Sequence, residues 1–208
     1  GKPGTPAPDG VLQAARHALD GHLIGYTDAM GLPSLRRRIL RHYQEWYGCD
    51  PRVDRIMVTT GSSAGFLLAF LAAFDAGDRV ALAAPGYPAY RNILSALGVE
   101  PLLLPADAEH RFQPTPELLD RLPAPPDGLI VASPSNAAGT MVGRSEMQAL
   151  VDYCRDAGIR LVSDEIYHGI CFDQPGVSAL EFTDEAIVIN SFSKYFSMTG
   201  WRLGWMVL

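Results

Sequence analysis

The sequence lacks the patterns that mark several common protein classes. Its three cysteines, Cys49, Cys154 and Cys171, are odd in number and form no CxxC pair, so neither a disulfide framework nor a zinc site is indicated. The five histidines contain no HExxH motif, and we predict no metal site. The longest apolar run, residues 66–74, is too short to cross a bilayer. The Pro/Gly-rich start is unlike a signal peptide, so we expect a cytoplasmic protein with no membrane partner.

An excess of basic charge is also missing. The 17 Lys and Arg residues against 23 Asp and Glu give a formal net charge of −6. Because nucleic-acid-binding domains usually present a basic face, we expect no nucleic-acid partner. Hydrophobic residues make up 48% of the chain and charged residues 19%, which is typical of a well-packed globular domain.

Extended and helical apolar patterns alternate along the chain. Strands that alternate with helices of about a dozen residues are typical of a mostly parallel sheet covered on both faces. The prediction is therefore an α/β fold, a three-layer α/β/α sandwich with a mostly parallel seven-stranded sheet. The expected helices are residues 11–19, 33–46, 62–74, 90–97, 114–122 and 144–156. The expected strands are residues 55–59, 79–83, 100–104, 128–132, 160–163, 186–190 and 202–208.

Polar residues follow these strands, at the sheet edge where open α/β sheets bind their ligands. A Gly/Ser turn at residues 59–65 opens an apolar helix, so its amides and hydroxyls would suit a phosphate; a plain serine N-cap is the simpler alternative. Each of the other polar groups has an ordinary explanation when taken alone, as a turn residue, a helix cap or a surface charge. Their joint placement indicates a site that contains Tyr87, Asn136, Asp164 and Lys194.

Five motifs run in order along the whole chain. They read GYTD at 25–28, GLPSLR at 31–36, SPSNAAGT at 133–140, VSDEIY at 162–167 and SFSKYFSMTGWRLG at 191–204. Together they resemble the fold-type I, pyridoxal phosphate-dependent aminotransferases of class I/II. The resemblance implies that the last strand of the sheet is antiparallel. The last motif is the most specific, because an arginine follows the lysine eight positions later.

The resemblance implies a pyridoxal 5′-phosphate site and a ping-pong transamination between an amino acid and a 2-oxo acid. Lys194 would form the internal aldimine with the cofactor and later carry the substrate Cα proton. Asp164 would pair with the pyridine nitrogen and keep the ring electron-withdrawing. Tyr167 and Asn136 would bind the ring hydroxyl oxygen, and Tyr87 would stack on the ring face. The catalytic residues implied are thus Lys194, Asp164 and Tyr167.

The resemblance also implies how the phosphate, the substrate and a second subunit are bound. Tyr26 would reach the phosphate of the neighbouring subunit, which implies a homodimer with a shared active site. The backbone of Gly1 would meet the substrate carboxylate, and Asn136 would also bind the substrate. The phosphate would lie on Ser62, Ser63 and the Ala64 amide, enclosed by Ser191 and Arg202, and Ser193 would also bind the cofactor.

The sequence departs from the family pattern in two ways. Where relatives read Asn-Pro-x-Gly, residues 136–139 read Asn-Ala-Ala-Gly, which leaves open whether the Asn136–Ala137 bond is cis or trans. Residues 1–208 would form the pyridoxal phosphate-binding large domain, without the N-terminal arm and without the small C-terminal domain that carries the carboxylate-binding arginine. The same motifs also suit a C–S lyase or the effector domain of a transcriptional regulator, and an α/β domain without a cofactor is the simplest alternative. The particular amino acid and 2-oxo acid stay open.

Overall fold

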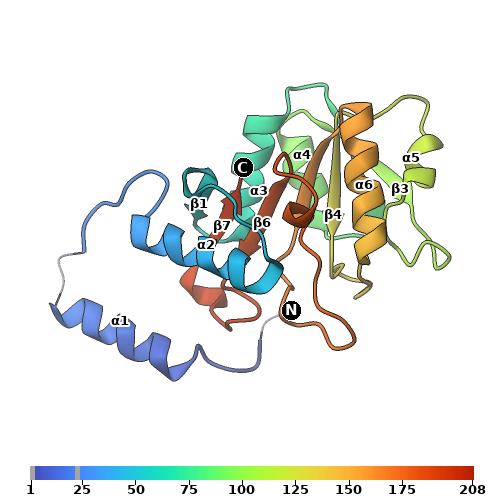
Figure 1. Cartoon of the computed structure of the whole chain (residues 1–208). Helices are drawn as coiled ribbons and strands as arrows, with labels where there is room; N and C mark the ends of the chain where they lie inside the picture. Colours follow the sequence, from blue (N-terminus) through green and yellow to red (C-terminus); the bar gives the residue numbers. More distant parts are fainter. Residues whose placement is uncertain (1–2, 22–23) are drawn as a thin grey trace.

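A computed structural model describes residues 3–21 and 24–208, and Figure 1 shows helices packed around a central sheet. The helices are α1 (Asp9–Gly21), α2 (Pro33–Tyr47), α3 (Ser62–Ala73), α4 (Pro88–Ala96), α5 (Pro116–Asp120) and α6 (Arg144–Ala157). The strands are β1 (Ile56–Thr59), β2 (Arg79–Ala84), β3 (Glu100–Pro105), β4 (Gly128–Ala132), β5 (Arg160–Asp164), β6 (Ile187–Ser191) and β7 (Gly204–Val207). Three short 3-10 turns complete the elements, at Val53–Arg55, at Ala179–Glu181 (η2) and at Thr199–Trp201 (η3).

The seven strands form one mixed sheet in the order β1-β7-β6-β5-β4-β2-β3. Strand β7 runs antiparallel to both its neighbours, whereas the pairs among β2, β3, β4, β5 and β6 are parallel. The predicted α/β class, strand number and antiparallel last strand are confirmed.

The last strand begins two residues later than predicted. Arg202 was expected inside it, but its φ is 51°, in the left-handed region, which an extended strand cannot contain. Arg202 instead follows the 3-10 turn η3, and this position directs its side chain to the start of α3, as described below.

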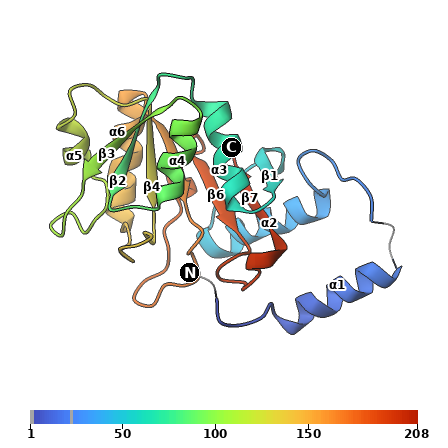
Figure 2. The same cartoon turned by 180° about the vertical axis from the view of Figure 1, so that it is seen from behind.

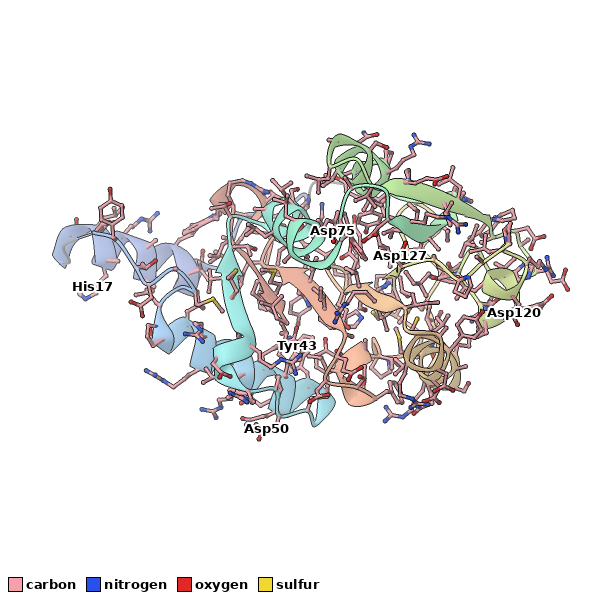
Figure 3. The ribbon with its side chains drawn as sticks, turned by 90° about the horizontal axis from the view of Figure 1, so that it is seen from above. His17, Tyr43, Asp50, Asp75, Asp120 and Asp127 are labelled. Atoms are coloured by element: carbon pink, nitrogen blue, oxygen red, sulfur yellow. The ribbon has the colours of Figure 1, made fainter. Side chains whose placement is uncertain are left out.

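Helices cover both faces of the sheet, as Figures 1 and 2 show from opposite sides. Helices α3 and α4 pack on one face and enclose a core that includes Phe70 and Val162. Helices α2 and α6 pack on the other face and enclose a core that includes Tyr43 and Leu161. Figure 3 shows Tyr43 reaching from α2 into the interior. Because side chains alternate along a strand, the neighbours Leu161 and Val162 of β5 belong to opposite cores.

Helix α1 lies apart from the sheet (Figure 1), and its described residues include no buried side chain. Its apolar residue Leu19 is 70% exposed. No helix within residues 3–21 and 24–208 has both the length and the apolar character that a membrane span requires.

Candidate active site

A cavity of about 190 Å³ opens at the carboxyl ends of β5 and β6. Nine residues that the sequence predicts for the site line it: Ser62, Ser63, Tyr87, Asn136, Asp164, Tyr167, Ser193, Lys194 and Arg202. They come from α3, from the turn after β2 and from the loops after β4, β5 and β6. The parallel strands therefore bring together side chains that are far apart in the sequence.

Asp164 is the buried carboxylate of this cavity, at the end of β5. Only 5% of the residue is exposed, and burial raises its pKa to about 6. Three neighbours oppose this rise. The Tyr90 hydroxyl donates to Oδ2, the Ile166 amide donates to Oδ1 at 3.0 Å, and the positive charge of Lys194 favours the anion. These donors hold a carboxylate at a place where it can meet a cationic ligand group.

Lys194 and two tyrosines surround the middle of the cavity. The Lys194 Nζ atom lies 5.7 Å from the ring centre of Tyr167. Tyr87 is 38% exposed and meets Tyr90 edge to face, with ring centres 5.4 Å apart. An amine, a phenol and an exposed aromatic face are thus available to one bound molecule.

The N-terminus of α3 forms the anion-binding end of the cavity. Its N-cap is Gly61, and no side chain in the described part of the protein caps it, so the predicted alternative of a plain serine cap is wrong. The uncapped amides and the positive end of the helix dipole favour a phosphate. Gly61 has a φ of 82°, and a Cβ there would clash with the Arg202 guanidinium. Glycine therefore lets the Arg202 guanidinium lie against the start of α3, beside Ser62 and Ser63.

Three other predicted residues, Ala64, Ser191 and Tyr26, are not part of the cavity wall. Ala64 and Ser191 do not line it, and the Ser191 hydroxyl is buried and accepts from the Ser193 amide at 3.1 Å. Tyr26 is fully exposed and does not line the cavity. Gly1 lies outside the described residues, so its predicted contact with a substrate stays untested.

Asn136 lies in a tight loop after β4. The Asn136–Ala137 peptide bond is cis, as are the bonds before Pro85 and Pro134. The loop is closed by the Ser135 amide, which donates to the Thr140 carbonyl at 2.8 Å. Asn136 reaches the cavity from this loop even though alanine follows it.

The sequence prediction missed Tyr90. This residue is 3% exposed, lies in α4 and lines the cavity beside Phe66, with ring centres 4.9 Å apart. Its hydroxyl is the side-chain donor to Asp164. The signal was its position three residues after Tyr87, which places both rings on one face of the first turn of a helix.

Among the residues that the structure describes, a second depression lacks the amine and the aromatic rings of this cavity. A depression of about 690 Å³ lies at the far end of the sheet, beside Arg160 and Leu208, and its described lining contains no lysine and no aromatic residue. A search of the described residues finds no group of three His, Cys, Asp or Glu side chains that could hold a metal ion. The cavity around Lys194 is therefore the candidate active site.

The sequence matches the family Aminotransferase class I and II over residues 1–208. It is 49% identical to a valine–pyruvate aminotransferase of Mycobacterium tuberculosis and 33% identical to an aspartate aminotransferase of Pyrococcus horikoshii, covering all of this chain and 54% of each relative. The chain thus spans about half the length of the curated relatives it matches.

Solved structures agree with the sequence matches. An aminotransferase from Mycobacterium tuberculosis superposes with a TM-score of 0.97 at 48% identity, covering all of this chain and 54% of that chain. An aspartate aminotransferase from Thermus thermophilus with maleate gives a TM-score of 0.94 at 28% identity, covering all of this chain and 55% of that chain.

Proposed function

The chain belongs to the class I and II aminotransferases, and from this premise we propose that its protein is a pyridoxal 5′-phosphate-dependent transaminase. It would move the amino group of an amino acid to a 2-oxo acid in a ping-pong cycle. The observation that carries the proposal is that Lys194, Asp164 and Arg202 line one cavity together with Ser62 and Ser63 at the N-terminus of α3. The relatives named above are all aminotransferases, which favours transamination over a C–S lyase or a regulator domain.

The residues present fit the cofactor at both ends. The uncapped start of α3, with Ser62, Ser63 and Arg202 on the wall, suits the phosphate. The buried carboxylate of Asp164 at the other end suits a protonated pyridine nitrogen. Bound pyridoxal phosphate would supply an aldehyde that takes up the amino group and a ring that withdraws electrons from the substrate Cα.

The roles of the individual side chains follow from their chemistry. Lys194 would bind the cofactor covalently and, once released, move the proton at the substrate Cα. Asp164 would hold the proton at the ring nitrogen. Tyr167 and Asn136 would orient the ring hydroxyl oxygen, and Tyr87 would stack on the ring. In this proposal Ser193 completes the phosphate site, whereas Ala64 and Ser191 would act through backbone and packing.

The larger assembly is part of the same proposal. Residues 1–208 would be the cofactor-binding large domain, and the protein would be a cytoplasmic homodimer with active sites shared between subunits. Full exposure of Tyr26 and the unburied helix α1 support a partner subunit that covers this side. The backbone of Gly1 would meet the substrate carboxylate, and Asn136 would also bind the substrate.

An amino-donor screen on the full-length protein tests this function. The name of the valine–pyruvate relative makes valine with pyruvate the first pair to assay, and aspartate with 2-oxoglutarate the second. We expect amino transfer that requires added pyridoxal phosphate and an acceptor acid. Prompt pyruvate release from cystathionine without any acceptor acid would instead favour the C–S lyase.

A further inference from the structure

A second carboxyl group lies next to Asp164 and is buried more deeply. Glu165 is 0% exposed. Its Oε1 accepts three hydrogen bonds, from Ser163 Oγ at 3.1 Å and from Ser178 Oγ and the Ala179 amide at 3.0 Å. Its Oε2 has no hydrogen-bond partner among the described residues. One oxygen is therefore fully supplied with donors and the other has none.

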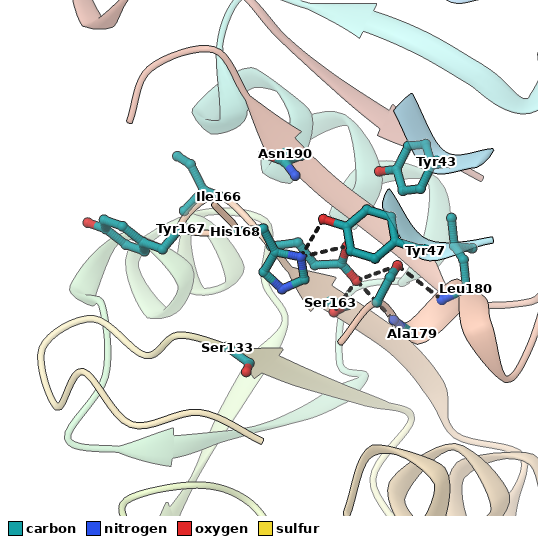
Figure 4. A network of polar contacts seen from close by, with 12 residues as sticks. Tyr43, Tyr47, Ser133, Ser163, Ile166, Tyr167, His168, Ala179, Leu180 and Asn190 are labelled. Carbon is teal, nitrogen blue, oxygen red and sulfur yellow. Dashed lines mark hydrogen bonds and ion pairs between the residues drawn. The ribbon is translucent and has the colours of Figure 1, made fainter. Parts of the chain in front are cut away.

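The oxygen without a donor lies near a buried tyrosine–histidine pair, Tyr47 and His168, which Figure 4 labels. Glu165 Oε2 lies 3.7 Å from His168 Nδ1, and the same nitrogen is hydrogen-bonded to Tyr47 Oη at 2.8 Å. The His168 side chain is 2% exposed. Burial lowers its pKa to about 4, against an opposing effect of the Ser133 backbone. A neutral imidazole carries a single N–H, so this pair offers Oε2 no cation.

The two neighbouring carboxyl groups occupy opposite faces of the sheet. Asp164 accepts from Tyr90 of α4, whereas Glu165 accepts from the Ala179 amide of η2. The charge of Glu165 also acts on Tyr47, the last residue of α2. Strand alternation causes this separation. The titratable groups that act on Glu165 or are acted on by it are Asp164, His168, Tyr43, Tyr47 and Cys49. Glu181 of η2 is ion-paired with Arg144.

These contacts suit a carboxylic acid better than a carboxylate. An ionised Oε2 without a donor would be costly in the interior. A protonated Oε2 becomes a donor and can hydrogen-bond to the His168–Tyr47 pair. Burial, and to a smaller extent the negative charge of Asp164, raises the pKa of Glu165 to about 8, in the direction that the geometry requires.

We infer that Glu165 is a positioning residue of the proposed reaction: a neutral, hydrogen-donating carboxylic acid that ties α2 and the turn bearing Tyr167 to the end of β5. This inference rests on the proposed function. Its proton stays on Oε2, and Asp164 is then the single negative charge at this strand end. An anion at Glu165 would repel that charge and favour protonation of Asp164, which must stay ionised to hold a protonated ring nitrogen.

Infrared difference spectroscopy on the full-length, cofactor-free protein tests the protonation directly. We expect a protonated-carboxyl C=O band near neutral pH that is absent in Glu165→Gln, is retained in Asp164→Asn and disappears as the pH passes about 8. If Glu165→Gln fails to fold, Tyr47→Phe serves instead, because removing the neighbouring hydroxyl should shift the band. Identical carboxylic-acid bands in wild type and variant would overturn the inference.

Pyridoxal phosphate affinity then tests the positioning role. Gln can accept at one terminal atom and donate at the other, so Glu165→Gln should bind within about twofold of wild type, whereas Glu165→Leu should lose about tenfold or more for the broken buried network. Exposed Glu185 gives the matched control, Glu185→Gln. Equal losses in Gln and Leu would mean that an anion is needed and would refute the inference. If wild type binds no cofactor, the proposed function fails, while the infrared result still decides the state of Glu165.

Discussion

Removing one hydroxyl group, in Tyr90→Phe, should change the titration of the catalytic carboxylate without repacking the core. The Tyr90 ring is 3% exposed and packs edge to face against Phe66 and Tyr87, contacts that phenylalanine preserves. Only the hydrogen bond to Asp164 is lost. The Ile166 amide still donates to the other carboxylate oxygen.

The magnitude follows from the charge on the acceptor. A hydrogen bond to a charged group contributes about 1.5 to 3 kcal/mol, and a change of one in pKa corresponds to about 1.4 kcal/mol. Because Asp164 is 5% exposed, solvent screens this bond little. The pKa of Asp164, now about 6, should therefore rise by about 1 to 2 in the variant. A large share of Asp164 would then be protonated at neutral pH.

The assay is the affinity of the cofactor-free protein for pyridoxal phosphate as a function of pH. Affinity should fall on the acid side as Asp164 becomes protonated, and this fall should begin about 1 to 2 pH units higher in Tyr90→Phe than in wild type. Tyr153→Phe is the matched control, since Tyr153 donates to Asp120 at 2.7 Å on the surface, where such a bond contributes little. Superimposable acid limbs for wild type and Tyr90→Phe would refute the assigned role of Tyr90.

Three further predictions follow from the site and its surroundings. Arg202→Ala should weaken pyridoxal phosphate binding by about 10- to 150-fold, the loss of about 1.5 to 3 kcal/mol for a charge-assisted contact; binding titrations that show no loss would remove Arg202 from the phosphate site. Gly61→Ala should lower the free energy of unfolding, measured by denaturant unfolding, by about 1 to 3 kcal/mol, because only glycine readily adopts this backbone conformation. The clash of the new Cβ with Arg202 should add to the loss. Gly200→Ala is the control and should change the free energy of unfolding little, because a Cβ there meets nothing within 4 Å. Glu165 keeps its proton in the folded state up to about pH 8 but releases it near its ordinary pKa of 4.5 when unfolded, so its contribution to stability falls as the pH rises through this window. His168, with its pKa lowered from 6.5 to about 4, acts in the opposite sense at lower pH. Above the range in which His168 titrates, from about pH 6.5 up to about pH 8, the free energy of unfolding of cofactor-free protein should therefore fall in wild type and stay level in Glu165→Gln. Parallel curves would contradict the buried, protonated state.

The sequence predicted those parts of the site that depend on strand ends. Asp164 ends the apolar strand β5 and Lys194 lies three residues after the apolar strand β6. The carboxyl ends of parallel strands meet at one edge of the sheet. Asn136 and Tyr87 follow strands in the same way. Their convergence in one cavity needed only the strand pattern and the direction of the strands.

The contacts that depend on packing between distant elements could not be predicted in this way. Tyr90 lies inside a helix, and its hydroxyl reaches Asp164 only because α4 packs on the face of the sheet to which Asp164 points. The alternation along β5 does place Glu165 on the opposite face. Its neighbour Tyr47, however, comes from α2, and no local pattern reveals where the end of that helix lies.

Arg202 shows a different limit. The apolar run that follows it predicts a strand, yet a left-handed backbone at Arg202 ends the 3-10 turn η3 and sends the guanidinium toward Gly61. Periodicity describes which residues face the core. It does not reveal the left-handed backbone of one residue, Arg202, that directs a side chain into the site.

The central claim is that Lys194 binds pyridoxal phosphate covalently. Borohydride reduction of the holoenzyme followed by peptide mass spectrometry tests it most directly. Within residues 1–208 the only other lysine is Lys2. We expect a pyridoxyl group on the peptide that contains Lys194, and none after Lys194→Ala. An adduct on a different lysine, or trapping that survives in Lys194→Ala, would contradict the account.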